Sequence, residues 1–328
     1  MDKDLSTTDE MTNRSEKIRS NRPFSILMPG KKVYSECFPE YCMTDEELKE
    51  LQDCLLGIFL EFKKICDENG IHYMMAGGTL LGTIRHKGFI PWDDDVDVMM
   101  TRAEYLKFSK TFKALKNAGK LDEYLLAEPL ESEEYYFKIP KLYKKNTDYF
   151  QITYMGNPRY NMASIDIFIV EYMPESSFMR SIRSLRFSVA FYASSFILDY
   201  IYPSDVILKK CRTDADLDRY YKARRMIGAL FQHLGGIRHY IKVCLKLAEY
   251  KKKTGFMGIP CGTSYTREVF RTKMFTESET GIFCGHEVSI PKDYDGFLTN
   301  LYGDYMKIPP KEEREIHTVC RDTVLRTE

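Results

Sequence analysis

The sequence lacks the cysteine spacing of a disulfide framework or of a zinc-binding motif. Its nine cysteines are odd in number and scattered, and no two of them form a C-x-x-C pair. A zinc site would have to combine Cys261, Cys284 and His286 across irregular gaps, and small buried hydrophobic residues are the better interpretation of these cysteines. We therefore expect reduced thiols and no structural zinc, as in a cytoplasmic protein.

The chain also lacks an excess of charge of one sign and a long apolar run. Lys and Arg total 48, as do Asp and Glu, so no overall field draws the protein to nucleic acid, and we expect no such partner. The apolar stretch at 187–202 includes Asp199 and is shorter than the ~20 residues that cross a bilayer. The N-terminus, MDKDLSTTDEMTNRSEK, has neither the basic start nor the apolar core of a signal peptide. These absences favour a cytoplasmic location.

The pattern along the chain divides it into four parts. Residues 1–43 have no sustained periodicity and are interpreted as an N-terminal arm. Residues 44–177 alternate helix and strand patterns, which predicts an α/β (α+β) catalytic core with a mixed sheet flanked by helices. Residues 178–254 are predicted to form a helical insertion, and residues 255–328, rich in Gly, Pro and aromatic residues, a C-terminal lobe that closes over the core.

Within the core, capping signals and hydrophobic periodicity predict individual elements. Thr44 with Glu47, and Thr101 with Glu104, are capping-box pairs that open helices ending near Gly70 and Asn117. A Gly-Gly-Thr turn at 77–79 is expected before a short helix. The short helix is predicted at Leu80–His86. The predicted strands are Ile71–Ala76, Asp95–Met99, Tyr124–Ala127, Tyr136–Tyr143 and Ser164–Val170.

The segment at 75–100, MAGGTLLGTIRHKGFIPWDDDVDVMM, combines a glycine turn with an acidic cluster. Asp95 and Asp97 are two apart on a predicted strand, so their carboxylates leave the same face and can ligate a hard cation such as Mg²⁺. Asp166 is a polar residue within an apolar strand pattern, and we predict it as the third acid of the site. These three residues are therefore the predicted catalytic and metal-binding residues.

The glycine turn is predicted to hold phosphate groups beside that metal. Gly77 and Gly78 would let the backbone approach a diphosphate, and Thr79 would offer a hydroxyl and an amide at the positive end of a helix. A solvated acidic loop is the simpler alternative, but the apolar residues among the acids fix the direction of the aspartates. A calcium loop is excluded because Val98 stands at its sixth position, where the sharp turn needs glycine.

Several basic residues are weaker candidates for substrate binding. Arg85 is interpreted either as a phosphate contact or as part of a structural ion pair. Lys138 and Lys141 lie in FKIPKLYKKNTDY and would bind nucleotide phosphates, although such a run is commonly a solvated face. His317 would either orient a catalytic acid or cap the C-terminal lobe.

The segment GGTLLGTIRHKGFIPWDDDVDV resembles the signature of the LicD and fukutin family of phosphotransferases, which have a nucleotidyltransferase fold. The similarity extends to Ser-Ile-Asp-Ile-Phe around Asp166, and to Ile-Pro-Lys-Asp-Tyr-Asp-Gly-Phe-Leu, Tyr-Gly-Asp-Tyr-Met and Pro-Pro near the C-terminus. The resemblance implies transfer of phosphocholine, or of a similar polyol phosphate, from a CDP carrier to a sugar hydroxyl of a cell-surface glycan precursor. It also implies Mg²⁺ or Mn²⁺ as cofactor, held by Asp95, Asp97 and Asp166.

Two other functions remain open on the sequence alone. One is a nucleotidyltransferase that attacks a nucleoside triphosphate, and the other is an inactive binding scaffold. The expected partners are a CDP-linked donor and a saccharide acceptor. The family resemblance implies that this acceptor can be linked to a lipid. Arg180, Arg183 and Arg186 precede the apolar stretch 187–202, so this segment is either a packed helix or an interfacial helix at the inner face of the membrane.

Overall fold

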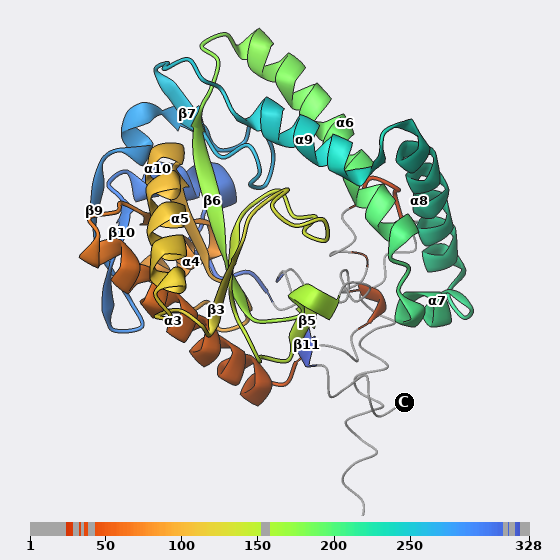
Figure 1. Ribbon diagram of the computed structural model, residues 1–328, viewed down its shortest axis with the longest axis horizontal. Helices are drawn as coiled ribbons and strands as arrows, with labels where there is room; N and C mark the ends of the chain where they lie inside the picture. Colours follow the sequence, from red (N-terminus) through yellow and green to blue (C-terminus); the bar gives the residue numbers. More distant parts are fainter. Residues whose placement is uncertain are drawn as a thin grey trace, which may run out of the picture.

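A computed structural model of the chain describes residues 24–28, 33, 36–38, 43–151, 158–310, 314 and 319–321 (Figure 1). Most of the predicted N-terminal arm and the candidate residue His317 lie outside the described residues.

The first long helix, α3 (Asp45–Glu68), begins where its capping box predicts. The Thr44 hydroxyl accepts a hydrogen bond from the Glu47 N–H at 3.2 Å, and the Glu47 carboxylate accepts one from the Thr44 N–H at 2.9 Å. Its apolar residues lie on one face at helical spacing and are buried against β4, β6 and α5. They include Leu51, Leu55, Ile58, Phe59, Phe62 and Ile65.

The main sheet is mixed, which confirms the predicted fold class. Its central order is β1-β2-β6-β4-β3, in which β2 and β6 are parallel and the other pairs are antiparallel. These strands are β1 (Met74–Met75), β2 (Asp97–Thr101), β6 (Ser164–Tyr172), β4 (Lys141–Lys144) and β3 (Tyr124–Ala127). Helix α5 (Arg102–Asn117), capped by Thr101 as predicted, and α3 cover one side of β6 in Figure 1, whereas α6, α8 and α9 arc over the other side.

Three predicted boundaries in the core were wrong. The strand predicted at 71–76 is reduced to β1, and helix α4 (Gly77–Arg85) begins at the first glycine rather than at Leu80. The strand predicted at 136–143 begins only at Lys141; Pro140 has no N–H for a sheet and restricts the residue before it. Asp95 precedes β2 instead of lying on it, so the argument from strand alternation holds for Asp97 but not for Asp95.

The region predicted to be helical contains four consecutive helices. Helix α6 packs against both α8 and α9, and a small core that includes Phe187, Ala190 and Cys244 lies between α6 and α9. None of the helices in the described ranges is both long enough and apolar enough to cross a membrane. The four helices are α6 (Ser177–Ile201), α7 (Asp205–Cys211), α8 (Ala215–Leu234) and α9 (Gly236–Ala248).

The C-terminal part completes the same core. Strand β7 (Phe256–Gly258) pairs with β6, and Phe283, Phe297 and Leu298 belong to the main hydrophobic cluster. Helix α10 (Tyr294–Tyr302) packs against α4 and places the residues that follow it beside the glycine turn. The remaining elements are β8 (Val269–Arg271), β9 (Ser278–Phe283), β10 (His286–Pro291), β5 (Tyr149–Gln151), β11 (Val319–Arg321), and the 3₁₀ turns η3 (Pro158–Tyr160) and η4 (Thr272–Phe275).

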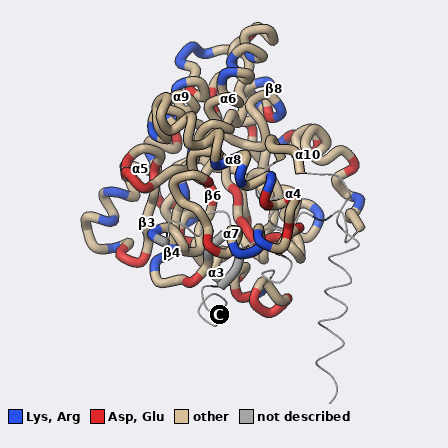
Figure 2. Tube along the Cα trace, turned by 90° about the vertical axis from the view of Figure 1, so that its right-hand side faces the viewer, with Lys and Arg blue, Asp and Glu red and all other residues tan. Residues whose placement is uncertain are grey.

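Charge of both signs is dispersed over the trace when the molecule is viewed from the side of α7 and α8 (Figure 2). This dispersion agrees with the equal totals of basic and acidic residues in the sequence.

Candidate active site

Two glycines at the start of α4 lie directly against two carboxylates. A Cβ atom added to Gly77 would stand 2.6 Å from Asp97 Oδ2, and one added to Gly78 would stand 2.8 Å from Asp93 Oδ2. Gly77 also has a φ of +50°, a conformation that L side chains rarely adopt. The first turn of a helix carries a partial positive charge, which favours carboxylates at this position. The glycines therefore make room for Asp93 and Asp97 at the helix N-terminus.

Thr79 joins this helix to the acid-bearing strand. Its side chain is 2% exposed, and its hydroxyl accepts a hydrogen bond from the Asp97 N–H at 2.8 Å. The structure gives this hydroxyl a positioning role beneath Asp97, and the phosphate contact predicted for Thr79 stays a prediction.

Asp97, Asp166 and Lys141 form a row across three adjacent strands. Asp97 is the register partner of Asp166 on parallel strands, and Lys141 is the register partner of Asp166 on the antiparallel side. The Lys141 ammonium lies 2.6 Å from Asp166 Oδ1. Lys141 is thus an ion-pair partner of a predicted catalytic acid.

A second group of acids stands just before β2. The carboxylates of Asp93, Asp94 and Asp95 each offer an oxygen within 4.8 Å of the others, a grouping that could hold a metal ion. All donors are hard oxygen atoms, the kind that Mg²⁺ and Mn²⁺ prefer. Among the described residues, the predicted trio Asp95, Asp97 and Asp166 is not grouped this closely. The sequence analysis gave Asp93 and Asp94 no ligand role, although both stand in the Asp-Asp-Asp run that drew attention to the segment.

The acids stand between two cavities. The first, here called the glycine cavity, has a volume of about 530 Å³ and lies between α4, the acidic loop and the C-terminal part. The second, the aromatic cavity, has a volume of about 350 Å³ and lies between β4, β6 and α6. Asp95 lines both cavities. The glycine cavity is lined by Gly77, Gly78, Arg85, Trp92, Asp93, Asp95, Asp97, Glu268, Tyr302 and Lys307, among others.

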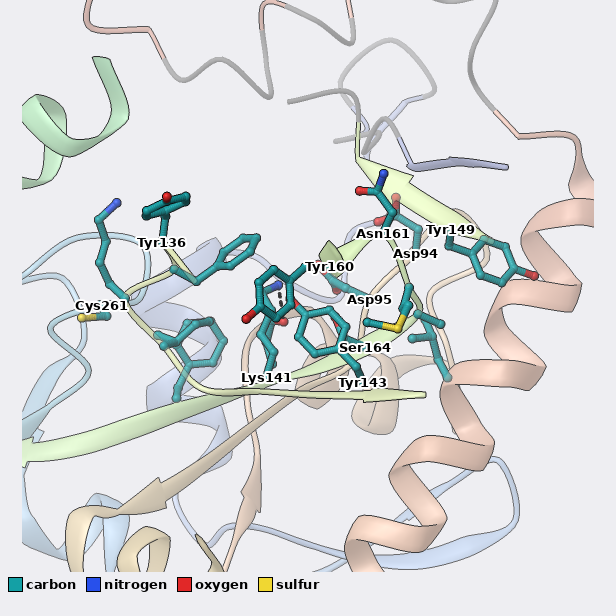
Figure 3. Close-up of a pocket in the computed structure, with 18 of the residues that line it drawn as sticks. Asp94, Asp95, Tyr136, Lys141, Tyr143, Tyr149, Tyr160, Asn161, Ser164 and Cys261 are labelled. Carbon is teal, nitrogen blue, oxygen red and sulfur yellow. Dashed lines mark hydrogen bonds and ion pairs between the residues drawn. The ribbon is translucent and has the colours of Figure 1, made fainter. Parts of the chain in front are cut away.

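The aromatic cavity brings together tyrosines and both candidate lysines. Figure 3 shows Tyr136, Tyr143 and Tyr160 around Lys141, with Asp95 on the side of the acids. The Tyr136 and Tyr202 hydroxyls are 2.9 Å apart and link the loop before β4 to the end of α6. Further lining residues are Phe137, Lys138, Tyr149, Asp94, Asp166, Phe191 and Leu198.

The Lys138 side chain lines the aromatic cavity, and its ammonium group faces the ring of Phe191. Its ammonium lies 4.3 Å from the centroid of Phe191 on α6. Burial lowers the pKa of Lys138, and in the part of the chain that the structure describes no carboxylate pairs with it. A contact between Lys138 and phosphate groups stays a prediction.

Arg85 on α4 forms hydrogen bonds with the segment that follows α10. One guanidinium nitrogen donates to the Tyr305 carbonyl at 2.6 Å and to the Lys307 carbonyl at 3.3 Å, and burial lowers the pKa of Arg85. Arg85 therefore has a structural role through hydrogen bonds to carbonyl groups, rather than through the ion pair that the sequence suggested. Its side chain also lines the glycine cavity.

Two further residues of the glycine cavity were missed in the sequence. Burial, and then the charges of Asp97, Asp93 and Asp95, raise the pKa of Tyr302. Glu268 is 5% exposed, and burial raises its pKa although its carboxylate accepts from the Thr263 N–H at 2.8 Å. Tyr302 could have been noticed in the Tyr-Gly-Asp-Tyr-Met segment, whereas nothing in the sequence around Glu268 points to the site.

Comparison with known proteins agrees with this geometry. Residues 70–203 match the family described as LicD/FKTN/FKRP, nucleotidyltransferase domain. The chain is 29% identical over 286 residues to the lipopolysaccharide cholinephosphotransferase LicD of Haemophilus influenzae, which covers 85% of this chain and 98% of that protein. It also matches an uncharacterized protein of Rickettsia typhi, with 36% identity over 65 residues, 20% of this chain and 21% of that protein. Residues 70–203, which carry the glycine turn and the acids, therefore belong to the LicD nucleotidyltransferase domain family.

Proposed function

We propose that this chain is a metal-dependent phosphotransferase that moves phosphocholine from a CDP-linked carrier to a sugar hydroxyl of a cell-surface glycan precursor. The observation that carries the proposal is the position of the acids between two cavities, with Asp95 facing both. The similar Haemophilus protein is named a lipopolysaccharide cholinephosphotransferase, which supports phosphocholine as the transferred group and a saccharide as the acceptor.

Two cavities on either side of the acids suit an in-line displacement, in which the attacking and leaving oxygens stand on opposite sides of the phosphorus. We assign the donor diphosphate to the glycine cavity, which is lined by Gly77 and Gly78 at the N-terminus of α4. The acceptor sugar is assigned to the aromatic cavity, whose rings offer apolar faces and whose tyrosines offer hydroxyls.

The acidic residues fit a divalent cation. Asp93, Asp94, Asp95 and Asp97 would hold it with carboxylate oxygens, and Mg²⁺ or Mn²⁺ bound there would neutralise the charge of the donor diphosphate. Gly77 and Gly78 keep the Asp97 and Asp93 carboxylates against α4, so these two ligands are positioned before any substrate binds.

The chain's own residues supply the proton acceptor. Asp166 lines the aromatic cavity and is held in place by its ion pair with Lys141, so it is our candidate to accept the proton of the attacking sugar hydroxyl. Lys138 adds positive charge on the acceptor side, where the transferred phosphoryl group arrives.

Release of CMP tests the proposal. The purified chain is incubated with CDP-choline, Mg²⁺ and a lipopolysaccharide acceptor, and CMP and the mass of the product are measured. We expect acceptor-dependent release of CMP, which falls by at least about 100-fold in Asp95→Asn because charge stabilisation is the main catalytic contribution. The matched control is Asp122→Asn, an exposed aspartate before β3 that should keep full activity.

Other outcomes would identify the rival functions. Release of pyrophosphate from CTP without choline transfer would show a nucleotidyltransferase. No release from any CDP-linked donor, with donor binding retained, would show a scaffold. Either result would overturn the proposed reaction.

A further inference from the structure

The first half of α6 carries an apolar face that points away from the protein. Phe178, Ile182, Leu185 and Val189 are spaced by four, three and four residues, so they lie along one face of the helix. They are 70%, 40%, 69% and 53% exposed, respectively. Large apolar side chains in a continuous exposed row are characteristic of an interaction surface rather than of ordinary surface scatter.

The arginines on the same helix do not all have the orientation expected from the sequence. Arg180 donates to the Pro174 carbonyl at 2.6 Å and lies 4.8 Å from the Phe256 ring centroid. Arg183 donates to the Tyr265 hydroxyl at 2.9 Å and to carbonyls at the end of α9. Both guanidinium groups bond to protein groups, so they are less available to a membrane surface than the sequence interpretation assumed. Arg186 alone of the three is exposed.

Basic residues nevertheless outnumber acidic ones along α6 and α9. Segment 176–198 contains three arginines and no acidic residue, and α9 contains Arg238, Lys242 and Lys246 and no acidic residue. Arg183 donates to the Glu249 carbonyl, so the exposed run 251–253, Lys-Lys-Lys, begins two residues after a contact with α6. Figure 2 shows Lys and Arg positions near the α6 and α9 labels. In a chain with a net charge of zero, this is a local basic excess.

We propose that the outward face of α6 docks on an anionic membrane surface as an interfacial helix. The apolar row would enter the interface, while Arg186 and the lysines at 251–253 would contact anionic head groups. Phe191, Leu198 and Tyr202, farther along the same helix, line the aromatic cavity. By helical periodicity Phe191 and Leu198 lie on the opposite face of α6 from the apolar row, so α6 would stand between that cavity and the membrane. The inference stands on exposure and charge and does not depend on the proposed reaction.

Co-sedimentation with vesicles tests the docking. The full chain is mixed with phosphatidylcholine vesicles that contain or lack phosphatidylglycerol, at low and high salt. We expect binding to the anionic vesicles only, weakened by salt. Phe178→Ser with Leu185→Ser should weaken it by at least about tenfold, because each side chain loses its burial in the interface. A charge variant, Arg186→Glu with Lys251, Lys252 and Lys253 changed to Glu, should also lose binding.

The matched control is Leu106→Ser on α5, which is 57% exposed on another part of the surface and should bind as the wild type does. Because every substituted residue is exposed, unfolding curves should stay unchanged, and release of CMP with a soluble acceptor should persist. A chain that stays in the supernatant at low salt overturns the proposal. So does binding that survives the Phe178/Leu185 variant, or a concentration-dependent dimer that this variant abolishes without any vesicle binding.

Discussion

Single residues explain why the acids of this site can stand where they do. Gly77 and Gly78 have no side chain, and the Asp97 and Asp93 carboxylates occupy the space that a Cβ would need. The sequence pattern linked these glycines only to substrate phosphates. The structure adds a role that applies even without substrate, since the glycines determine how closely two acids approach the N-terminus of α4.

Gly78→Ala isolates this effect. The new Cβ would meet Asp93 Oδ2 at 2.8 Å, and because that oxygen ends a rotatable side chain, the carboxylate can move away at little cost in folding energy. We expect turnover to fall by at least about tenfold, since misplacement of a catalytic group by about 1 Å is costly. The free energy of unfolding in urea should change by no more than about 1 kcal/mol.

Gly57→Ala is the matched control for this substitution. Gly57 lies within α3, and a Cβ added there would meet no atom within 4 Å, so alanine should stabilise the helix by up to about 1 kcal/mol and leave turnover unchanged. Full activity in Gly78→Ala would show that the position of Asp93 does not matter for the reaction.

At the scale of elements, the site depends on how α4 meets β2. The helix begins just after the short strand β1, and the Thr79 hydroxyl in its first turn accepts from the Asp97 N–H at the start of β2. Asp97 then aligns with Asp166 on β6, and Asp166 with Lys141 on β4. One buried hydroxyl thus connects the glycine turn to the row of charged residues.

Thr79→Val removes that connection with little change of shape. We expect a loss of about 1–3 kcal/mol in the free energy of unfolding, because a buried hydrogen bond is broken, together with lower turnover. Thr79→Ser keeps the hydroxyl and should recover most of both quantities. Denaturant unfolding and CMP release measure them, and equal behaviour of the Val and Ser variants would exclude the hydroxyl as the cause.

On the scale of the whole molecule, distant parts of the chain complete the glycine cavity. Arg85 on α4 binds the carbonyls of Tyr305 and Lys307, and Glu268 and Tyr302 come from the C-terminal part. The buried end of that part shares the main hydrophobic core with α3 and the sheet. Binding at the acids should therefore stabilise the complete fold rather than one lobe.

The effect of a bound metal ion on thermal unfolding would measure how strongly the site is coupled to the whole fold. A cation that binds only the folded chain stabilises it by about 2.7 kcal/mol at 100 times its dissociation constant. We expect Mg²⁺ to raise the thermal unfolding midpoint, EDTA to reverse the change, and Asp95→Asn to abolish it while Asp122→Asn retains it. An unchanged midpoint at saturating Mg²⁺ in the wild type would argue against a resident cation at these aspartates.

The sequence by itself determined the parts that depend on near neighbours in the chain. The capping box of Thr44 with Glu47, the N-cap Thr101 and the apolar strand at 124–127 were predicted correctly because the interactions that form them are local. Thr101 and Glu104 form only half of a capping box, since the Glu104 carboxylate accepts from the His72 N–H. The mixed α/β class followed from the order of such elements.

Only the tertiary structure decided which side chains meet. The pairing of Lys141 with Asp166 depends on strand register, and the approach of Glu268 and Tyr302 to the acids depends on the docking of the C-terminal part, neither of which leaves a periodic signal in the sequence. The inward turn of Arg180 and Arg183, and the outward apolar row beside them, likewise follow from which face of α6 packs against α9 and the strand β7.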